Sequence, residues 1–419
     1  MSISCKEWQA WAVVMAWTAV IYLTVPFAIE IRRFALEHLG GPEAFLWIVM
    51  AGVVALFVVL IRIVYRSPRQ ASSRGVAWLL LIAAILLYNA WQRRDRPVEA
   101  LHYLEYGLLG LFLFRALRFR IPDVLIYPCV ILIGGLLGTI DEIIQWVTPG
   151  RLWDWRDIGF NISAVALMQA AVLLGIRPDG IDRRPAARSI QAGCRLALVF
   201  IVLAILCLAN TPERADRYTT RIPALHSLYR NPSTMSEYGH LYRDPAIGAF
   251  KSRLSPEALH KIDSERAGEA ARALDEFRNP RLYDACLEAY PAHVEPFIHE
   301  ARVHLWSMTH HLGILWTNRW DEPMRDDLNP ARVRKHATSC YKEYQIMSIY
   351  FSNTMQRSHY APYPSQLNTL KAHADPSPSY RSKVSRYVIT ALPELAFYML
   401  LMPLAMVAIG IDLWLQLKS

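Results

Sequence analysis

The 419-residue sequence has only six cysteines, and none of them forms a Cys-x-x-Cys pair. We therefore expect no cysteine-based metal site. Cys286 and Cys340 lie in the one long polar segment, where a disulfide and two unpaired core thiols are equally compatible with the sequence. The sequence also has no repeat of fixed period and no alternating strand pattern of convincing length, which favours an all-α fold.

Apolar residues make up 53% of the chain and are concentrated in blocks. A helix that crosses the hydrocarbon core of a bilayer needs about 20 mostly apolar residues. The first block has a weak basic flank and no small-residue cleavage site, so we expect a retained span rather than a signal peptide. The sequence predicts about eight transmembrane helices, at residues 8–29, 44–65, 75–92, 101–117, 123–147, 157–175, 194–210 and 387–415.

The net charge of +9 does not indicate nucleic-acid binding, because much of the excess is arginine in short loops between spans. Loops after the second, fourth and sixth spans hold twelve arginines, whereas the alternate loops hold seven. The richer side should be cytoplasmic, which places both termini inside and residues 211–386 outside. The twelve are Arg62, Arg66, Arg69, Arg74, Arg115, Arg118, Arg120, Arg177, Arg183, Arg184, Arg188 and Arg195; the seven are Arg32, Arg33, Arg93, Arg94, Arg96, Arg151 and Arg156.

The predicted fold class is an all-α, polytopic membrane helical bundle with a helical soluble outer domain. Helix-start signals in the outer domain predict helices at 255–278, 296–316 and 329–356. The stretch 357–386 is rich in Pro and Ser and should be poorly structured. The predicted parts are N-terminal transmembrane helices (1–92), a membrane core (93–176), a basic cytoplasmic loop with the seventh transmembrane helix (177–210), an extracytoplasmic domain (211–386) and a C-terminal transmembrane helix (387–419).

Three segments of the membrane core break the apolar pattern with polar residues at helical spacing. They lie at the start of the fourth span, the end of the fifth and the start of the sixth, and the predicted topology brings all three to the outer side. Charged groups in membrane helices are costly unless they pair or line a wet cavity, so this convergence indicates a site. Its candidates are His102, Glu105 and Tyr106, then Asp141, Glu142 and Gln145, and finally Arg151, Asp154, Asp157 and Asn161.

The chemistry of these residues allows two interpretations. Several carboxylates with one histidine suit a metal site with oxygen ligands, or an acid/base pair with separated pKa values. His102 and Glu105 are the candidate pair, with Arg151 as an anion binder. A salt-bridge network that only holds three helices together is the alternative. In the same way, Asp154 is either a site residue or the cap of its helix.

In this order, the residues resemble the pattern of the VanZ-like membrane protein family. That pattern is His-x-x-Glu-Tyr (His102, Glu105, Tyr106), Asp-Glu-x-x-Gln (Asp141, Glu142, Gln145), then Arg, Asp and Asn (Arg151, Asp157, Asn161). The family is named for a protein associated with resistance to a glycopeptide antibiotic. The resemblance therefore implies a role at the cytoplasmic membrane and cell envelope, on a lipid-linked or glycopeptide-like molecule, without implying a reaction.

Two further features carry weaker predictions. Trp146, Trp153 and Trp155 are typical of an interfacial aromatic belt. Eleven of the thirteen histidines lie in the outer domain, where Glu300, His304 and His311 can share a helix face without matching the zincin spacing. They permit a metal site without requiring one, and the cofactor remains unknown. The competing function is a non-catalytic envelope scaffold whose outer domain binds a protein partner.

Overall fold

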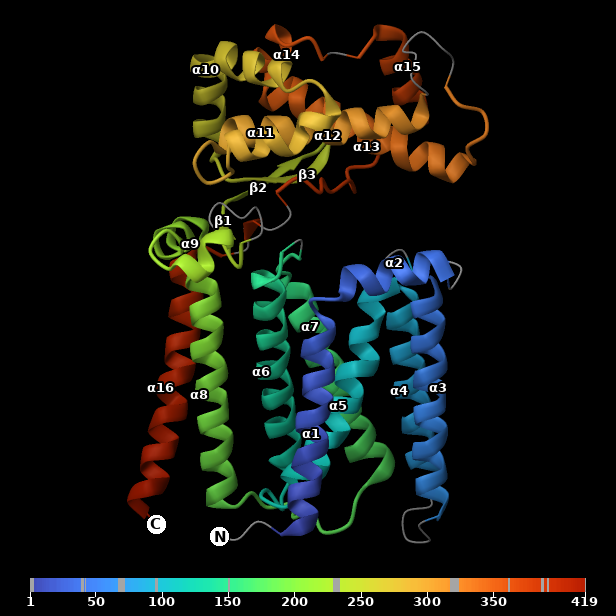
Figure 1. Ribbon diagram of the computed structural model, residues 1–419, viewed down its shortest axis with the longest axis vertical. Helices are drawn as coiled ribbons and strands as arrows, with labels where there is room; N and C mark the ends of the chain where they lie inside the picture. The colour runs from blue at the N-terminus through green and yellow to red at the C-terminus, as the bar shows by residue number, and fades with distance from the viewer. Residues whose placement is uncertain are drawn as a thin grey trace. The chain divides into compact units, whose positions relative to one another are not determined.

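The structure is a computed structural model that describes residues 4–38, 41, 43–66, 72–94, 97–149, 151–228, 234–316, 324–360, 362–385, 388–389 and 392–418. Arg69 and Arg96, two of the arginines that predict orientation, lie outside these residues. The chain divides into two compact units (Figure 1). One is formed by Met1–Leu208 with Tyr398–Ser419, and the other by Ala209–Phe397.

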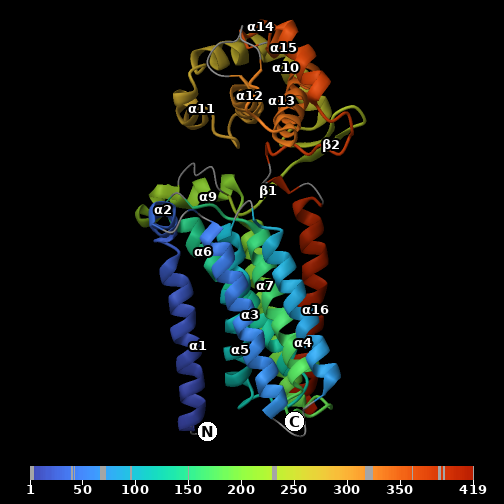
Figure 2. The same ribbon diagram turned by 90° about the vertical axis from the view of Figure 1, so that its right-hand side faces the viewer.

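The first unit is a bundle of long helices that run side by side (Figures 1 and 2). Six described helices are long and apolar enough to cross a membrane, which confirms the predicted helical, multi-pass class. The count of eight spans stays a prediction. The six are α3 (Glu43–Arg66), α4 (Ser73–Trp91), α6 (Ile126–Val147), α7 (Trp155–Ala170) with its π-helical continuation η2 (Ala171–Ile176), α8 (Ala187–Ala209) and α16 (Glu394–Lys418).

The other two predicted spans also form helices, but they are less suited to crossing a membrane. Helix α5 (Leu101–Leu117) has only 17 residues. Helix α1 (Cys5–Thr24) begins with polar residues and ends earlier than predicted, because the chain turns and continues as the separate α2 (Ala28–His38). A short 3-10 turn, η1 (Pro97–Ala100), leads into α5.

Helix α7 packs against both α5 and α6 and forms the centre of the unit. The Gln169 Nε2 donates to the Gly110 carbonyl of α5 at 3.0 Å. Helix α1 is tied to the same group, since Trp17 Nε1 donates to the Glu105 carbonyl and Tyr22 Oη donates to the Leu137 carbonyl, both at 2.9 Å. These bonds hold α1 beside the polar segments of α5 and α6.

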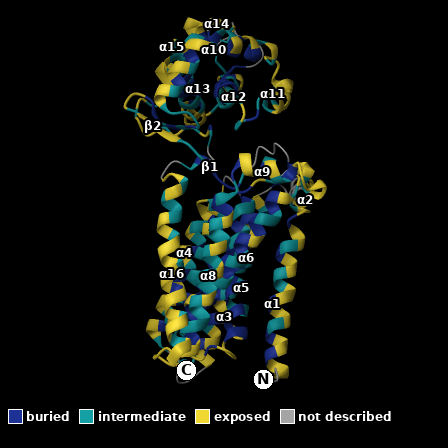
Figure 3. Ribbon diagram, turned by 90° about the vertical axis from the view of Figure 1, so that its left-hand side faces the viewer, coloured by how far each residue is buried: buried dark blue, intermediate teal, exposed yellow. Residues whose placement is uncertain are grey.

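Many residues of the outer helices of this unit are exposed (Figure 3), and they include large apolar ones. Met399, Leu400 and Met406 of α16 and Leu206 of α8 are all more than half exposed. Contiguous apolar surface of this kind is unfavourable in water and favourable against lipid tails. The exposed faces therefore support a lipid bilayer as the surroundings of this unit.

The second unit is also mainly helical. The predicted helix starts are confirmed: Ser255 Oγ accepts from the Ala258 amide at 3.2 Å, and Asn329 Oδ1 accepts from the Arg332 amide at 2.8 Å. The helices are α9 (Pro212–Thr219), η3 (Pro223–Leu228), α10 (Pro256–Glu276), η4 (Pro280–Leu282), α11 (Tyr283–Ala289), α12 (Pro296–Leu315), α13 (Pro330–Tyr350), α14 (Ser352–Arg357) and α15 (Pro364–His373).

One expectation about this unit is wrong, and one minor feature was not predicted. The stretch predicted to be poorly structured contains α15, which begins at Pro364, a residue favoured in the first turn of a helix. The unit also has two small sheets: β2 (His240–Asp244) pairs antiparallel with β3 (Gly248–Ser252), and β1 (Glu237–Tyr238) pairs parallel with β4 (Val388–Ile389). Strands of two to five residues are too short to produce a recognisable alternation in sequence.

Candidate functional site

The three predicted polar segments lie at one end of the helix bundle of the first unit (Figure 1). Helix α5 begins there, α6 ends there, and α7 begins there after a short connection. The structure therefore brings together His102 of α5, Asp141 of α6 and Asp157 of α7, which lie within electrostatic reach of one another. The polar residues of this cluster form two groups: in the paired half the side chains are hydrogen-bonded to one another, and in the unpaired half polar atoms lack hydrogen-bond partners among the described residues.

The paired half is a chain of hydrogen bonds between the end of α6 and the start of α7. Glu142 is fully buried, and its carboxylate accepts from Gln145 Nε2 at 2.7 Å and from the Asp154 amide at 3.1 Å. Arg151 donates in turn to Gln145 Oε1. Asp154 caps α7 by accepting from the Arg156 amide at 2.9 Å, and it also forms an ion pair with the Arg156 guanidinium. These residues stabilise the α6–α7 connection.

The unpaired half consists of polar atoms that the described residues leave without a hydrogen bond. They are the His102 Nδ1, the Tyr106 hydroxyl, the Asp141 Oδ1, the Asp157 Oδ1 and both side-chain polar atoms of Asn161. The Tyr106 hydroxyl lies near Asp141 without a hydrogen bond of good geometry. Leaving such an atom buried and unpaired costs about 1–3 kcal/mol, so this half is not explained by a role in holding helices together.

Glu105 lies one turn from His102 on α5 and is partly exposed. It is within electrostatic reach of both His102 and Asp141, so it belongs to the unpaired half by position. The rings of His102 and Tyr106 are 6.2 Å apart on the same face of the helix. The predicted triplet His102, Glu105 and Tyr106 therefore faces α6 and α7 as one group.

Glycines on α6 allow α7 to approach this closely. A Cβ atom added to Gly138 would lie 2.8 Å from the Asn161 Cβ, and one added to Gly134 would lie 2.7 Å from a Val165 methyl. Contacts that short are sterically forbidden, so only glycine fits at these two positions. The close approach places Asn161, which is fully buried, directly against the polar end of α6.

Tyr22 and Arg93 lie near the cluster, although the sequence-based prediction did not place either of them there. Tyr22 of α1 lies within electrostatic reach of Asp141. The Arg93 guanidinium lies 3.6 Å from the centroid of the Phe160 ring and 5.1 Å from that of Tyr103. Arg93 falls between predicted spans, where it was assigned only a role in orientation. Its cation–π contacts depend on the packing of α5 against α7, which no local pattern encodes.

The predicted aromatic belt is wrong for two of its three members. Trp146 and Trp153 are buried within the bundle, at 5% and 1% exposure, so they do not lie at a lipid interface. The Trp153 and Trp155 rings contact edge to face, with centroids 5.2 Å apart. Trp153 immediately precedes Asp154, the cap of α7.

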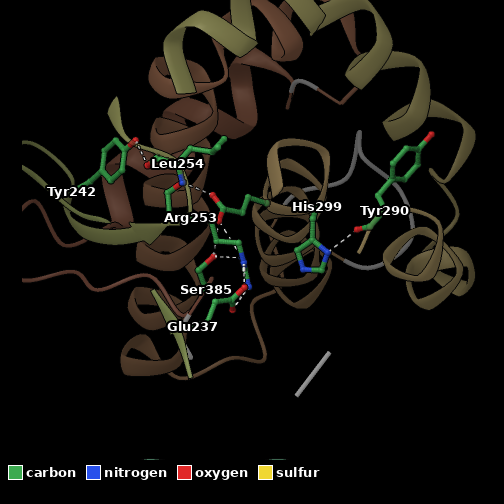
Figure 4. Close-up of polar contacts among 9 residues, drawn as sticks. Glu237, Tyr242, Arg253, Leu254, Tyr290, His299 and Ser385 are labelled. Carbon is green, nitrogen blue, oxygen red and sulfur yellow. Dashed lines mark hydrogen bonds and ion pairs between the residues drawn. The ribbon is translucent and has the colours of Figure 1, made fainter. Parts of the chain in front are cut away.

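In the second unit, the predicted metal-capable trio is distributed over separate networks. Glu300 is fully buried and accepts from Ser252 Oγ at 2.5 Å, from the Arg253 amide at 2.8 Å and from the Arg253 guanidinium at 3.1 Å. Arg253 also donates to both carboxylate oxygens of Glu237 and to Ser385 Oγ (Figure 4). This network ties β1, β3 and the segment before β4 to α12.

Glu343 of α13 is the centre of a second buried network. It accepts from Tyr380 Oη at 2.6 Å and Ser382 Oγ at 2.7 Å, and it pairs with His304 Nδ1 at 2.6 Å. Burial alone would raise the pKa of Glu343, but these three partners together hold its pKa below the usual value. The remaining histidine of the trio, His311, pairs with His336 at 3.0 Å between their Nδ1 atoms.

Among the residues that the structure describes, no group of three or more His, Cys, Asp or Glu side chains is arranged to hold a metal ion. Cys286 and Cys340 are both buried and both free. The structure therefore has two unpaired core thiols and no disulfide between these residues. Comparison with known proteins finds no matching family profile, no matching curated protein and no matching solved structure. The resemblance to the VanZ-like family rests on the motif residues alone.

Proposed function

We propose that this is a VanZ-like, multi-pass protein of the cytoplasmic membrane that binds an amphiphilic envelope molecule in the polar cluster. In this proposal the chain has eight spans, both termini are cytoplasmic, and residues 211–386 are extracytoplasmic. The cluster then opens to the outer leaflet, where a lipid-linked or glycopeptide-like head group can enter.

The observation that supports this proposal is the unpaired half of the cluster. Asp141, Asp157 and Asn161 offer acceptors and donors suited to a head group rich in hydroxyl or amine groups. Arg93 and Arg151 would face its anionic part, and each has a buried Nε without a partner among the described residues. Pairing these atoms with a ligand would recover the desolvation cost that the protein otherwise bears.

Each candidate residue has a role in this proposal. His102 and Glu105 form the acid/base pair, because their side chains are adjacent and reach toward Asp141. Tyr106 and Asn161 orient the bound group by hydrogen bonds. Glu142 and Gln145, which are already paired, are positioning residues that hold the start of α7.

The test compares Asp141→Asn and Glu105→Gln with Glu142→Gln as the structural comparator. Each variant is purified in detergent, its thermal unfolding is followed, and native mass spectrometry counts co-purifying phosphate-containing lipid. We expect Asp141→Asn and Glu105→Gln to lose bound lipid while unfolding at or above the wild-type temperature. Glu142→Gln should lose stability, since leaving a buried hydrogen-bonding group without its partner costs about 1–3 kcal/mol.

The competing function is a non-catalytic scaffold whose second unit binds a protein partner. The Glu142–Gln145–Arg151 chain favours it, because that half of the cluster has a purely structural explanation. The scaffold predicts that Asp141→Asn destabilises the protein as strongly as Glu142→Gln and leaves lipid binding unchanged. That result would refute the proposed binding site.

A further inference from the structure

The second unit contains a pocket of about 990 Å³ that lies outside the polar cluster of the first unit. Its lining includes Arg278, Trp306, His310, Gly313, Tyr360 and Tyr363. Small-molecule sites typically enclose about 300–1,000 Å³ and combine aromatic walls with a few polar groups. The size and the composition of this pocket both fit that class.

The aromatic wall presents flat faces held in fixed orientations. The Trp306 and His310 rings are stacked on successive turns of α12, with centroids 4.9 Å apart and planes 14° from parallel. The Tyr283 ring also packs against the Trp306 ring, at 5.1 Å, so the indole lies between two rings and supports the exposed His310 ring. On the opposite segment, Tyr360 Oη donates to the Leu274 carbonyl at 3.2 Å, which fixes its ring. Rings held in this way stack well on a planar or saccharide ring.

The charge in the pocket comes from Arg278. Its guanidinium lies 5.3 Å from the centroid of the Tyr360 ring, and no described carboxylate forms an ion pair with it. Asp275, three residues earlier in the chain, accepts from the His359 amide and pairs with the His359 ring at 2.8 Å. Arg278 is therefore available to an anionic group of a ligand.

Gly313 leaves room in the wall of the pocket. It lies within α12, where glycine costs about 1 kcal/mol relative to alanine, and it has a negative φ angle that any residue can adopt. A Cβ atom added there would meet no atom of the described residues within 4 Å. Neither backbone conformation nor packing requires glycine, and its absence of side chain keeps the pocket open at this turn.

We propose that this pocket binds a small organic anion whose flat ring stacks on the exposed His310 and Tyr363 rings and whose charged group pairs with Arg278. The ring is aromatic or saccharide, because both kinds of ring stack on imidazole and phenol faces. The proposal does not depend on the function of the membrane unit.

The test uses equilibrium dialysis of the full-length protein in nanodiscs, with empty nanodiscs subtracted. The ring-bearing probes are 2-naphthyl phosphate and glucose 1-phosphate; 2-naphthol lacks the charge, and inorganic phosphate lacks the ring. We expect saturable binding of at least one ring-bearing probe, and the tighter of the two identifies the kind of ring. 2-Naphthol and inorganic phosphate, which each lack either the charge or the ring, should bind at least tenfold more weakly.

Two variants locate the binding, each with a matched control. Gly313→Leu fills the pocket from an open helical position, and Gly410→Leu makes the same change at an open position of α16. Arg278→Gln removes the charge, and Arg332→Gln removes an exposed arginine of α13 outside the lining. We expect Gly313→Leu and Arg278→Gln to bind the probe at least tenfold more weakly. The controls Gly410→Leu and Arg332→Gln should bind it as the wild type does. Unfolding temperatures close to wild type verify that the variants fold.

Three results would overturn the proposal: no saturable binding of either ring-bearing probe, equal binding of 2-naphthol or inorganic phosphate, or equal losses in variants and controls. The second outcome would identify a purely apolar cavity or a simple anion site.

Discussion

The buried network around Arg253 supports a quantitative prediction about the second unit. The Arg253→Met variant keeps a side chain of similar length and removes the guanidinium. In the wild type that group donates to Glu237 Oε2 at 2.7 Å, to Ser385 Oγ at 3.0 Å and to Glu300 Oε1 at 3.1 Å. The variant leaves the fully buried Glu300 carboxylate without its cation. Removing one partner of a buried pair typically costs about 3–5 kcal/mol, so we expect the second unit to lose that much stability.

The assay is thermal unfolding of the full-length protein in detergent, followed by hydrogen exchange of peptides from α12 and β3. For a unit of this size, each kcal/mol lowers the unfolding temperature by about 2–4 °C, which gives a decrease of roughly 6–20 °C. The matched control is Arg266→Met, which removes an arginine from two surface pairs, with Glu269 and with Glu295, and should cost at most about 1–2 kcal/mol. Equal effects of the two substitutions would refute the reasoning, because burial would then make no difference.

Three further predictions concern other parts of the chain. Gly138→Val should destabilise the membrane unit by about 1–3 kcal/mol, because the new side chain overlaps Asn161; Gly159→Ala, at an open position, should have little effect on detergent unfolding temperature. Burial, with the nearby Arg253 charge, lowers the pKa of His299 to about 4, so the unfolded state binds more protons between pH 6.5 and 4. Stability of the second unit should therefore fall as pH decreases through that range, by about 2 kcal/mol at pH 5 relative to pH 8, and His299→Gln should reduce the slope of unfolding temperature against pH. Cys340 is fully buried and free, so a maleimide should label it only at the rate at which the second unit opens; rapid labelling of the folded protein would contradict its placement.

The length of the apolar blocks alone predicted the membrane helices of this chain. A bilayer requires about 20 consecutive, mostly apolar residues, and such a run can be recognised in the sequence without knowledge of distant contacts. Cap residues such as Ser255 and Asn329 likewise predicted their helices, since the capping bond lies within three residues of the cap. Helical periodicity also indicated which residues share a face, for example His102 and Tyr106.

Only the tertiary structure decided which of these polar residues pair and which remain unpaired. Glu142 and Asp141 are adjacent in sequence and equally buried, yet Glu142 accepts two hydrogen bonds and Asp141 Oδ1 accepts none. Their difference depends on the path of the chain between α6 and α7, and that path is not a local property. The short strands and the approach of Arg93 to Phe160 depend on contacts between distant segments in the same way. Local patterns specify helices and their faces, whereas the partners of each face arise only when the helices pack.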